Sequence, residues 1–132
     1  MLIDTANAAQ INAKDIYLHD DLFIAFRFNR DSCEVNILCS DYKHNYEIVF
    51  CEVIGLEMTS CDFWGPGPNI DCFYVVNENE CVLIPKLQEE YEKYSTPDEL
   101  PFDRKRYVET VLSLCSGDHI RIASKTVRIG KK

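Results

Sequence analysis

The sequence predicts a mainly β fold (α+β at most), an antiparallel sandwich, roll or partly open barrel with one or two short helices. Several short segments alternate hydrophobic and polar residues, and clusters of Asn, Asp, Gly and Pro separate them. Strands at such short spacing, without a helix between each pair, favour antiparallel pairing over a parallel sheet. A chain of 132 residues has the usual size of one domain, so we expect a single domain over residues 1–132.

The first half of the chain is predicted to form a short helix and then three strands. Asp4 or Thr5 is a suitable N-cap for a helix that continues to about Ala13. From residue 22 the period changes to two, and one strand face is predicted to carry Leu22, Ile24, Phe26 and Phe28. After a turn at residues 29–32, the inward positions of the next strands are Cys33, Val35, Ile37, Cys39, Tyr46, Ile48 and Phe50, and Gly55 marks a bulge.

The second half of the chain adds further strands and one interruption. Gly65-Pro66-Gly67-Pro68 predicts a tight loop, because proline lacks the backbone donor that a ladder needs. The next strand is predicted to alternate through Ile70, Cys72, Tyr74 and Val76. Residues 85–106 are interpreted as an insertion or long loop with a short helix, because Leu87, Tyr91 and Tyr94 have helical spacing. Residues 107–115 form a strand, and the turn at 116–118 precedes a last pair of strands around Ile120 and Ile122 and around Val127 and Ile129.

The amino terminus and the cysteine count predict a cytoplasmic protein. The opening Met1-Leu2-Ile3-Asp4 lacks a basic segment followed by an apolar stretch, and no apolar run reaches bilayer-spanning length. The seven cysteines are odd in number, and their closest pair for a zinc site is Cys33 and Cys39, which lacks Cys-x-x-Cys spacing. Cys33, Cys39 and Cys72 are therefore expected to be reduced and to pack as small hydrophobic side chains.

The net charge of −8 is unevenly distributed along the chain. Residues 1–103 carry 6 basic and 20 acidic side chains, whereas residues 104–132 carry 8 basic and 2 acidic ones. We expect basic side chains of the last strands to pair with acidic ones across the sheet. A nucleic-acid surface is disfavoured, because residues 121–132 contain no aromatic residue that could stack on bases.

Two polar clusters are candidates for function. His19-Asp20-Asp21 combines imidazole and carboxylate groups, which could serve a metal- or ligand-dependent enzyme or a small-molecule site, or simply form a turn. The second cluster contains the single tryptophan, Trp64, next to the proline-rich loop and between the carboxylates of Asp62 and Asp71. These three residues are the candidate binding residues, since loop aromatics supply contact area; the structural alternative, which is favoured, is that Trp64 closes one end of the core.

The sequence assigns no catalytic residue, no metal ligand and no cofactor. It contains neither a glycine-rich phosphate loop nor a Gly-x-Ser-x-Gly elbow nor a His-Glu-x-x-His helix. A non-catalytic role is therefore favoured over an enzyme, and self-assembly through an unpaired strand edge is a further structural alternative.

One resemblance bears on function. The order of His19-Asp20-Asp21 before a strand, the segment YEIVFCEVI at residues 46–54 and Ser116-Gly117-Asp118 before a short strand resembles small bacterial β-domains grouped with immunity proteins of toxin systems, and related uncharacterised families. This resemblance implies a protein that binds a toxin partner and neutralises it, without assigning any residue to that role. The acidic charge would suit a basic protein partner.

Overall fold

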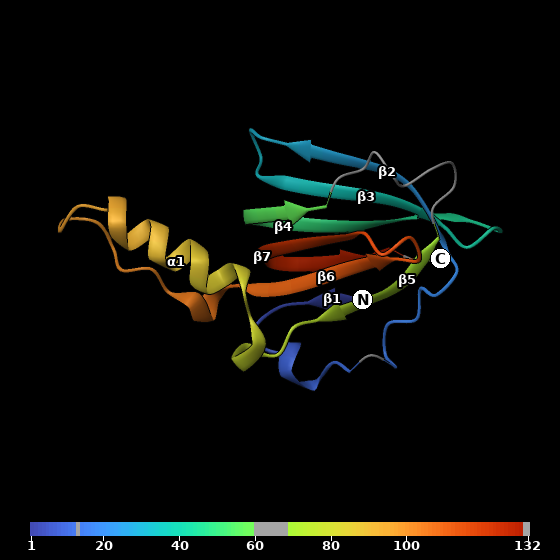
Figure 1. The fold of residues 1–132 in the computed structure, drawn as a ribbon, viewed down its shortest axis with the longest axis horizontal. Helices are drawn as coiled ribbons and strands as arrows, with labels where there is room; N and C mark the ends of the chain where they lie inside the picture. Colours follow the sequence, from blue (N-terminus) through green and yellow to red (C-terminus); the bar gives the residue numbers. More distant parts are fainter. Residues whose placement is uncertain (13, 60–68, 131–132) are drawn as a thin grey trace.

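The computed structural model describes residues 1–12, 14–59 and 69–130, and in these ranges the chain is a seven-stranded antiparallel sheet with one α-helix (Figure 1). The strand order is β2-β3-β4-β7-β6-β5, and β1 also pairs with β7. The strands are β1 (Leu2–Ile3), β2 (Leu22–Asn29), β3 (Glu34–Ser40), β4 (Asn45–Met58), β5 (Ile70–Val75), β6 (Val108–Leu114) and β7 (His119–Ile129). The helical elements are α1 (Leu83–Tyr94) and the 3₁₀ turns η1 (Ala8–Gln10), η3 (Glu78–Glu80) and η4 (Arg104–Arg106).

The sheet curls until its two outer strands meet at one point without closing. Leu22 at the start of β2 forms an isolated antiparallel bridge with Asn69, directly before β5. The Asp20 N–H donates to the Ile70 carbonyl and the Ile70 N–H donates to the Asp21 carbonyl, both at 2.8 Å. The prediction of a mainly β, antiparallel fold of the sandwich, roll or partly open barrel type is thereby confirmed.

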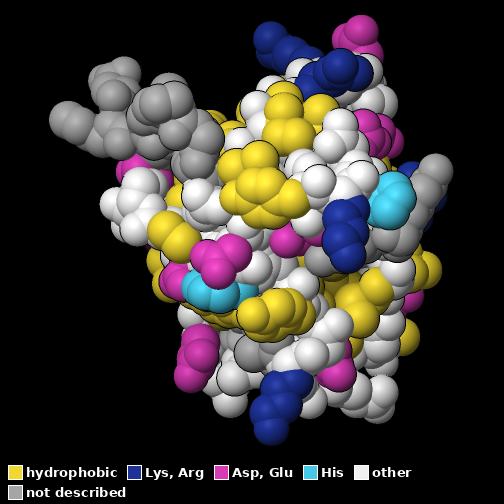
Figure 2. Space-filling view, turned by 90° about the vertical axis from the view of Figure 1, so that its right-hand side faces the viewer, with side chains coloured by type: hydrophobic (Ala, Val, Ile, Leu, Met, Phe, Trp, Pro, Cys, Tyr) yellow, Lys and Arg dark blue, Asp and Glu magenta, His cyan; other side chains and the backbone are white. Residues whose placement is uncertain are grey.

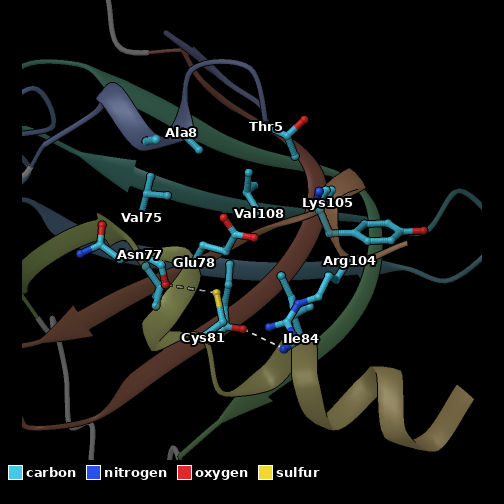
Figure 3. A pocket seen from close by; sticks show the side chains of 14 residues that line it. Thr5, Ala8, Val75, Asn77, Glu78, Cys81, Ile84, Arg104, Lys105 and Val108 are labelled. Atoms are coloured by element: carbon cyan, nitrogen blue, oxygen red, sulfur yellow. Dashed lines mark hydrogen bonds between the residues drawn. The ribbon is translucent and has the colours of Figure 1, made fainter. Parts of the chain in front are cut away.

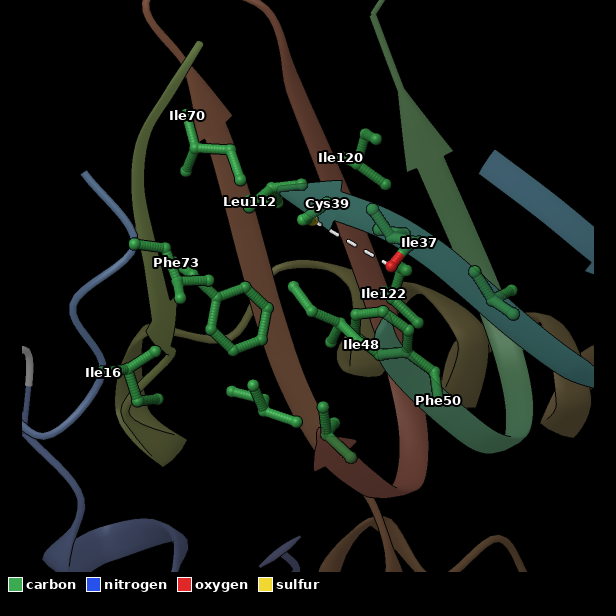
Figure 4. Packing of buried hydrophobic residues seen from close by; sticks show 14 of the residues in the cluster. Ile16, Ile37, Cys39, Ile48, Phe50, Ile70, Phe73, Leu112, Ile120 and Ile122 are labelled. Carbon is green, nitrogen blue, oxygen red and sulfur yellow. Dashed lines mark hydrogen bonds between the residues drawn. The ribbon is translucent and has the colours of Figure 1, made fainter. Parts of the chain in front are cut away.

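The concave face of the curled sheet holds the main hydrophobic core (Figure 4). The rings of Phe50 on β4 and Phe73 on β5 lie 6.2 Å apart between centroids, although two strands separate β4 from β5 in the sheet. This contact across the interior follows from the curl. The completely or almost completely buried side chains around it include Ile37, Ile48, Ile70, Leu112, Ile120 and Ile122.

Bulges at the sheet margins overturn part of the predicted alternation. A register shift between Phe23 and Ala25 makes Phe23 the buried residue of β2 and leaves Ile24 46% exposed. Phe26 and Phe28 pair with the buried Ile37 and Val35 and so keep the predicted side, although Phe28, near the end of the edge strand, is 47% exposed. A second shift between Ile70 and Cys72 brings Phe73 inward, so Cys72 is exposed, and Tyr74 is 37% exposed. The extra residue of a β-bulge moves every side chain that follows it to the opposite face of the sheet. A period-two sequence pattern does not reveal where such a bulge lies.

Of the other predictions for local structure, some are wrong and some are confirmed. The predicted N-terminal helix is only the turn η1, because the Asp4 side chain accepts hydrogen bonds from the Ala6 and Asn7 N–H groups in a local turn; Ala13 lies outside the described residues. The predicted last pair of strands is one continuous strand, β7. The bulge at Gly55, the turn at 116–118 and the burial of Val35, Ile37 and Cys39 are confirmed.

Helix α1 packs on the convex face of the sheet at β4 and β7. Its Leu83 and Ile84 form a second cluster with Ala123 of β7, and Leu87 lies over Gly55 of β4. Pro85 is the third residue of α1, where the missing N–H is tolerated because the first N–H groups of a helix have no intrahelical acceptor. None of the helices in the described ranges has the length and apolar character needed to span a membrane.

The buried carboxylate of Glu109 anchors the start of α1 to the sheet. Glu109 lies on β6 and is 1% exposed, and its oxygens accept hydrogen bonds from the N–H groups of Val82 at 3.0 Å and Ile84 at 2.8 Å. The Arg121 guanidinium on β7 donates to the same carboxylate, which confirms one of the expected pairings of C-terminal basic residues. Burial alone would raise the pKa of Glu109, but the backbone donors and Arg121 together hold the pKa below its ordinary value of 4.5.

We expect Gly55→Ala to destabilise the protein only while Leu87 is present. A Cβ at position 55 would overlap a Leu87 methyl carbon, so packing must shift, at a cost of about 1–3 kcal/mol. Leu87→Ala removes the colliding atoms. A double-mutant cycle by urea denaturation should show a large cost of Gly55→Ala in the parent and almost none in the Leu87→Ala background; equal costs in both would contradict the packing argument.

We also expect Glu109 to contribute stability above pH 4.5 that is lost as the pH falls through its lowered pKa. Glu109→Gln should reduce the free energy of unfolding at pH 7 by about 3 kcal/mol, because Arg121 and the α1 N–H groups lose their anion. Glu52→Gln, on an exposed pair with Lys125, is the matched control and should change stability by about 0.5 kcal/mol or less. The measurement is the free energy of unfolding of the parent and of both variants, from denaturation series between pH 3 and 7. The assignment would be contradicted if both variants, Glu109→Gln included, lost the same stability on acidification as the parent.

Candidate functional site

A continuous polar and aromatic surface surrounds the point where the two sheet edges meet. We call it the tyrosine–histidine–aspartate surface and define it by Tyr17, His19, Asp20, Tyr42, Asn69, Asp71 and Tyr74. It draws on the segment before β2, the β3–β4 turn, and β5 with the residue that precedes it. These three segments are far apart in the sequence, and the bridge between Leu22 and Asn69 brings them together.

His19 connects the segment before β2 to β5. Its Nδ1 lies 3.0 Å from the Asp71 carbonyl oxygen, which can only accept, so Nδ1 carries a proton. Its Nε2 faces the Asp20 carboxylate at 3.5 Å, and Asp71 Oδ1 lies 3.8 Å from Nδ1. The imidazole therefore lies between the carboxylates of Asp20 and Asp71. Asp20 belongs to the same predicted cluster as His19, whereas Asp71 belongs to the predicted cluster around Trp64.

Asn69 links the other side of the surface. Its Nδ2 donates to the Asp20 carbonyl and to the Tyr42 hydroxyl, both at 2.8 Å. Tyr42 adopts a left-handed backbone with φ of 73°, and its N–H donates to Ser40 Oγ at 3.0 Å. Asp20 is also left-handed, with φ of 69°. Two strained turns are therefore held in register by one amide side chain.

The tyrosine rings of this surface are well exposed. The exposed fraction is 72% for Tyr17, 66% for Tyr42 and 37% for Tyr74, and the Tyr17 ring centroid lies 6.3 Å from that of His19. Tyr17 and Tyr74 border an apolar hollow whose lining also includes Ile16, Leu18 and Phe73. Figure 2 shows histidine, carboxylate and hydrophobic side chains side by side on this end of the molecule.

Asp21 points away from this surface into the protein. It is 8% exposed, and its Oδ2 accepts a 2.6 Å hydrogen bond from the hydroxyl of Tyr46, which is 3% exposed. Burial and then the bond to Asp21 raise the pKa of the Tyr46 phenol far above its ordinary value of 10.0. The structure therefore brings His19 and Asp20 together but separates Asp21 from them as an internal acceptor.

The other predicted binding residues are placed only in part. Asp71 belongs to the surface, whereas Asp62 and Trp64 lie outside the described residues. Asn69, where the described chain resumes, is itself a member of the surface. Sequence reasoning missed Tyr42 and Asn69 because positive φ and a side-chain bridge have no periodic signal, and it placed Tyr74 inward because the bulge in β5 was not foreseen.

The thiols differ from their expected role as core residues. Cys39 is buried as expected, but Cys33 lies exposed in the β2–β3 turn with φ of 52°, and Cys72 and Cys115 are also exposed. Cys51 and Cys81 are half-buried. Among the residues that the structure describes, no group of three or more His, Cys, Asp or Glu side chains is arranged to hold a metal ion.

Comparisons with protein-family models, with curated proteins and with solved structures found no match to this chain. The functional argument therefore rests on the geometry of the tyrosine–histidine–aspartate surface itself.

We expect the Tyr46 phenol to stay protonated in the folded protein well beyond the ordinary tyrosine range. The stabilisation from its raised pKa is fully present below pH 10.0 and is lost as the pH rises above that value. Tyr46→Phe should leave the alkaline absorbance titration of the folded protein unchanged and remove one phenol from the titration in denaturant. Loss of one titrating phenol from the folded protein below about pH 11 would contradict the burial argument.

Proposed function

We propose that this protein is a non-catalytic protein-binding domain that engages its partner through the tyrosine–histidine–aspartate surface. The observation that carries the proposal is the set of exposed tyrosines, Tyr17, Tyr42 and Tyr74, grouped around fixed hydrogen bonds of His19 and Asn69. Tyrosine supplies a large contact area with few rotatable bonds, so it loses little conformational entropy on binding. The Tyr42 side chain, whose hydroxyl already accepts a hydrogen bond from Asn69, loses still less.

The charge of the surface supports a basic partner. The Asp20 and Asp71 side chains are 71% and 54% exposed, so both carboxylates can contact a partner's cations. No lysine or arginine belongs to the surface as defined, and residues 1–103 carry 20 acidic side chains against 6 basic ones. Such an imbalance accelerates encounter with a positively charged protein and favours it over acidic competitors.

We propose that the partner is a toxin and that this protein is an immunity-type protein that neutralises it. This role places the protein in the bacterial cytoplasm. The support is the sequence resemblance together with an acidic, tyrosine-rich surface that blocks a basic active site by covering it. This role needs neither cofactor nor catalytic residue. It also gives a function to the polar bonds around Asn69, because they keep the contact residues from two sheet edges in one arrangement.

We expect a photo-crosslinking residue at position 17 to capture a basic protein from lysate of the source cells, and the same residue at position 94 to capture none. Tyr94 is the matched control because it is 76% exposed and lies at the end of α1, outside the surface. With the captured partner purified, Tyr17→Ala and Tyr74→Ala should each weaken binding about tenfold or more, and Tyr94→Ala should leave it unchanged.

Two results would contradict this proposal. One is equal crosslinking from positions 17 and 94, and the other is unchanged affinity of folded Tyr17→Ala and Tyr74→Ala proteins for the purified partner. The affinity should also fall as salt is added, because opposite charges steer the encounter.

A further inference from the structure

A second concave feature, the basic pocket, lies beside the start of α1 and is built from segments far apart in the sequence (Figure 3). Its volume is about 340 Å³. Walls come from the N-terminal segment at Thr5 and Ala8, from the connection after β5 at Asn77 and Cys81, and from the segment before β6 at Arg104 and Tyr107. The tyrosine–histidine–aspartate surface shares no residue with this pocket.

The Glu109 carboxylate in the basic pocket already has its hydrogen-bond and ion-pair partners within the protein. Glu109 lines the pocket, and its carboxylate accepts hydrogen bonds from Val82, Ile84 and Arg121. The N–H groups at the start of α1 that would attract an anion therefore already have one, and Arg121 has its counter-ion. Any ligand charge must be met by side chains nearer the pocket mouth.

Besides Glu109, the charged residues that line the pocket are Arg104, Lys105 and Glu78, and Arg104 is the half-buried one of the two cations. It is half-buried at the start of η4, and within the described ranges no carboxylate lies within 4.0 Å of its guanidinium. Asp103 is the N-cap of η4, since its carboxylate accepts the Lys105 N–H at 3.1 Å, and this bond fixes the turn from which Arg104 and Lys105 both line the pocket. Glu78 also lines the pocket but pairs with neither.

The neighbouring thiol does not supply the missing negative charge. Burial and then Glu109 raise the pKa of Cys81 to about 11, although Arg104 and Arg121 act in the opposite direction. Cys81 is therefore a neutral thiol near pH 7, and it donates to the Asn77 carbonyl at 3.5 Å. Arg104 is left as a half-buried cation that pairs with no carboxylate of the described residues, an arrangement that favours binding of an anion.

We propose that the basic pocket binds a small organic anion whose carboxylate or phosphate group is held by Arg104 and Lys105. Charge-assisted hydrogen bonds from a guanidinium to either group are short and strong, and Arg can bind both oxygens of a carboxylate at once. The apolar part of the ligand would lie against Ala8, Val75 and Ile84. Because the volume is near the lower end of the ~300–1,000 Å³ of ligand pockets, the ligand is small.

The test is a chemical-shift titration of the isotope-labelled full chain with benzoate, with its neutral analogue benzamide and with inorganic phosphate. We expect saturable shifts at the backbone amides of Cys81 and Lys105 with benzoate, and binding of benzamide at least about tenfold weaker. The ratio of benzoate to phosphate affinity distinguishes an organic acid from a phosphate ligand.

Arg104→Gln should weaken benzoate binding about tenfold or more, whereas Arg27→Gln, on the distant strand β2, should leave it unchanged. The spectrum of each variant shows directly whether it is folded. Equal affinity of benzoate and benzamide, equal binding by folded Arg104→Gln, or no saturable shift with either anion would overturn the proposal. None of these results bears on the protein-binding role, because that role uses other residues.

Discussion

The structure depends on the pairing of residues 20–22 with residues 69–70, where the two outer strands of the curled sheet meet. The two 2.8 Å backbone bonds between Asp20, Asp21 and Ile70 join the margins of the concave face, across which the rings of Phe50 and Phe73 are in contact. The same pairing places Asn69 against Asp20 and His19 against Asp71. The pairing of these two segments therefore brings the residues of the tyrosine–histidine–aspartate surface together at the margin of the core.

Strand β5 connects the two proposed binding regions. It begins at Ile70, beside the tyrosine–histidine–aspartate surface, and leads through Val75 into the wall of the basic pocket. Its inner side is fixed by Ile70 and Phe73, which are 0% and 1% exposed. The edge strand thus carries Asp71, near its start, and Tyr74, next to Val75, outward to the surface, and Val75 itself lines the pocket. Each region therefore has a wall that packing into the core has already ordered.

Sequence reasoning predicted the fold class, most strand positions and the turn at 116–118, because burial on one face of a strand imposes a period of two. It failed where an extra residue or a left-handed backbone changes direction. The bulge after Ile70 turned Cys72 and Tyr74 outward, and positive φ at Cys33 removed that thiol from the core. His19, Asp20 and Asp71 were found as candidates because their residue types are suggestive, whereas Asn69 acts only through contacts that closure creates.

Glu109 is the residue that sequence pattern alone was least able to interpret. In β6 it looks like an outward, solvated position, yet helix α1 covers it and turns its carboxylate into a buried anchor. Because this anchor satisfies both the start of α1 and Arg121, the positive charge left on the pocket wall is that of Arg104 with Lys105. By pairing with Arg121, the Glu109 carboxylate leaves Arg104 and Lys105 as the cations that can bind an external anion. The same carboxylate fixes the start of α1, which forms part of the pocket wall.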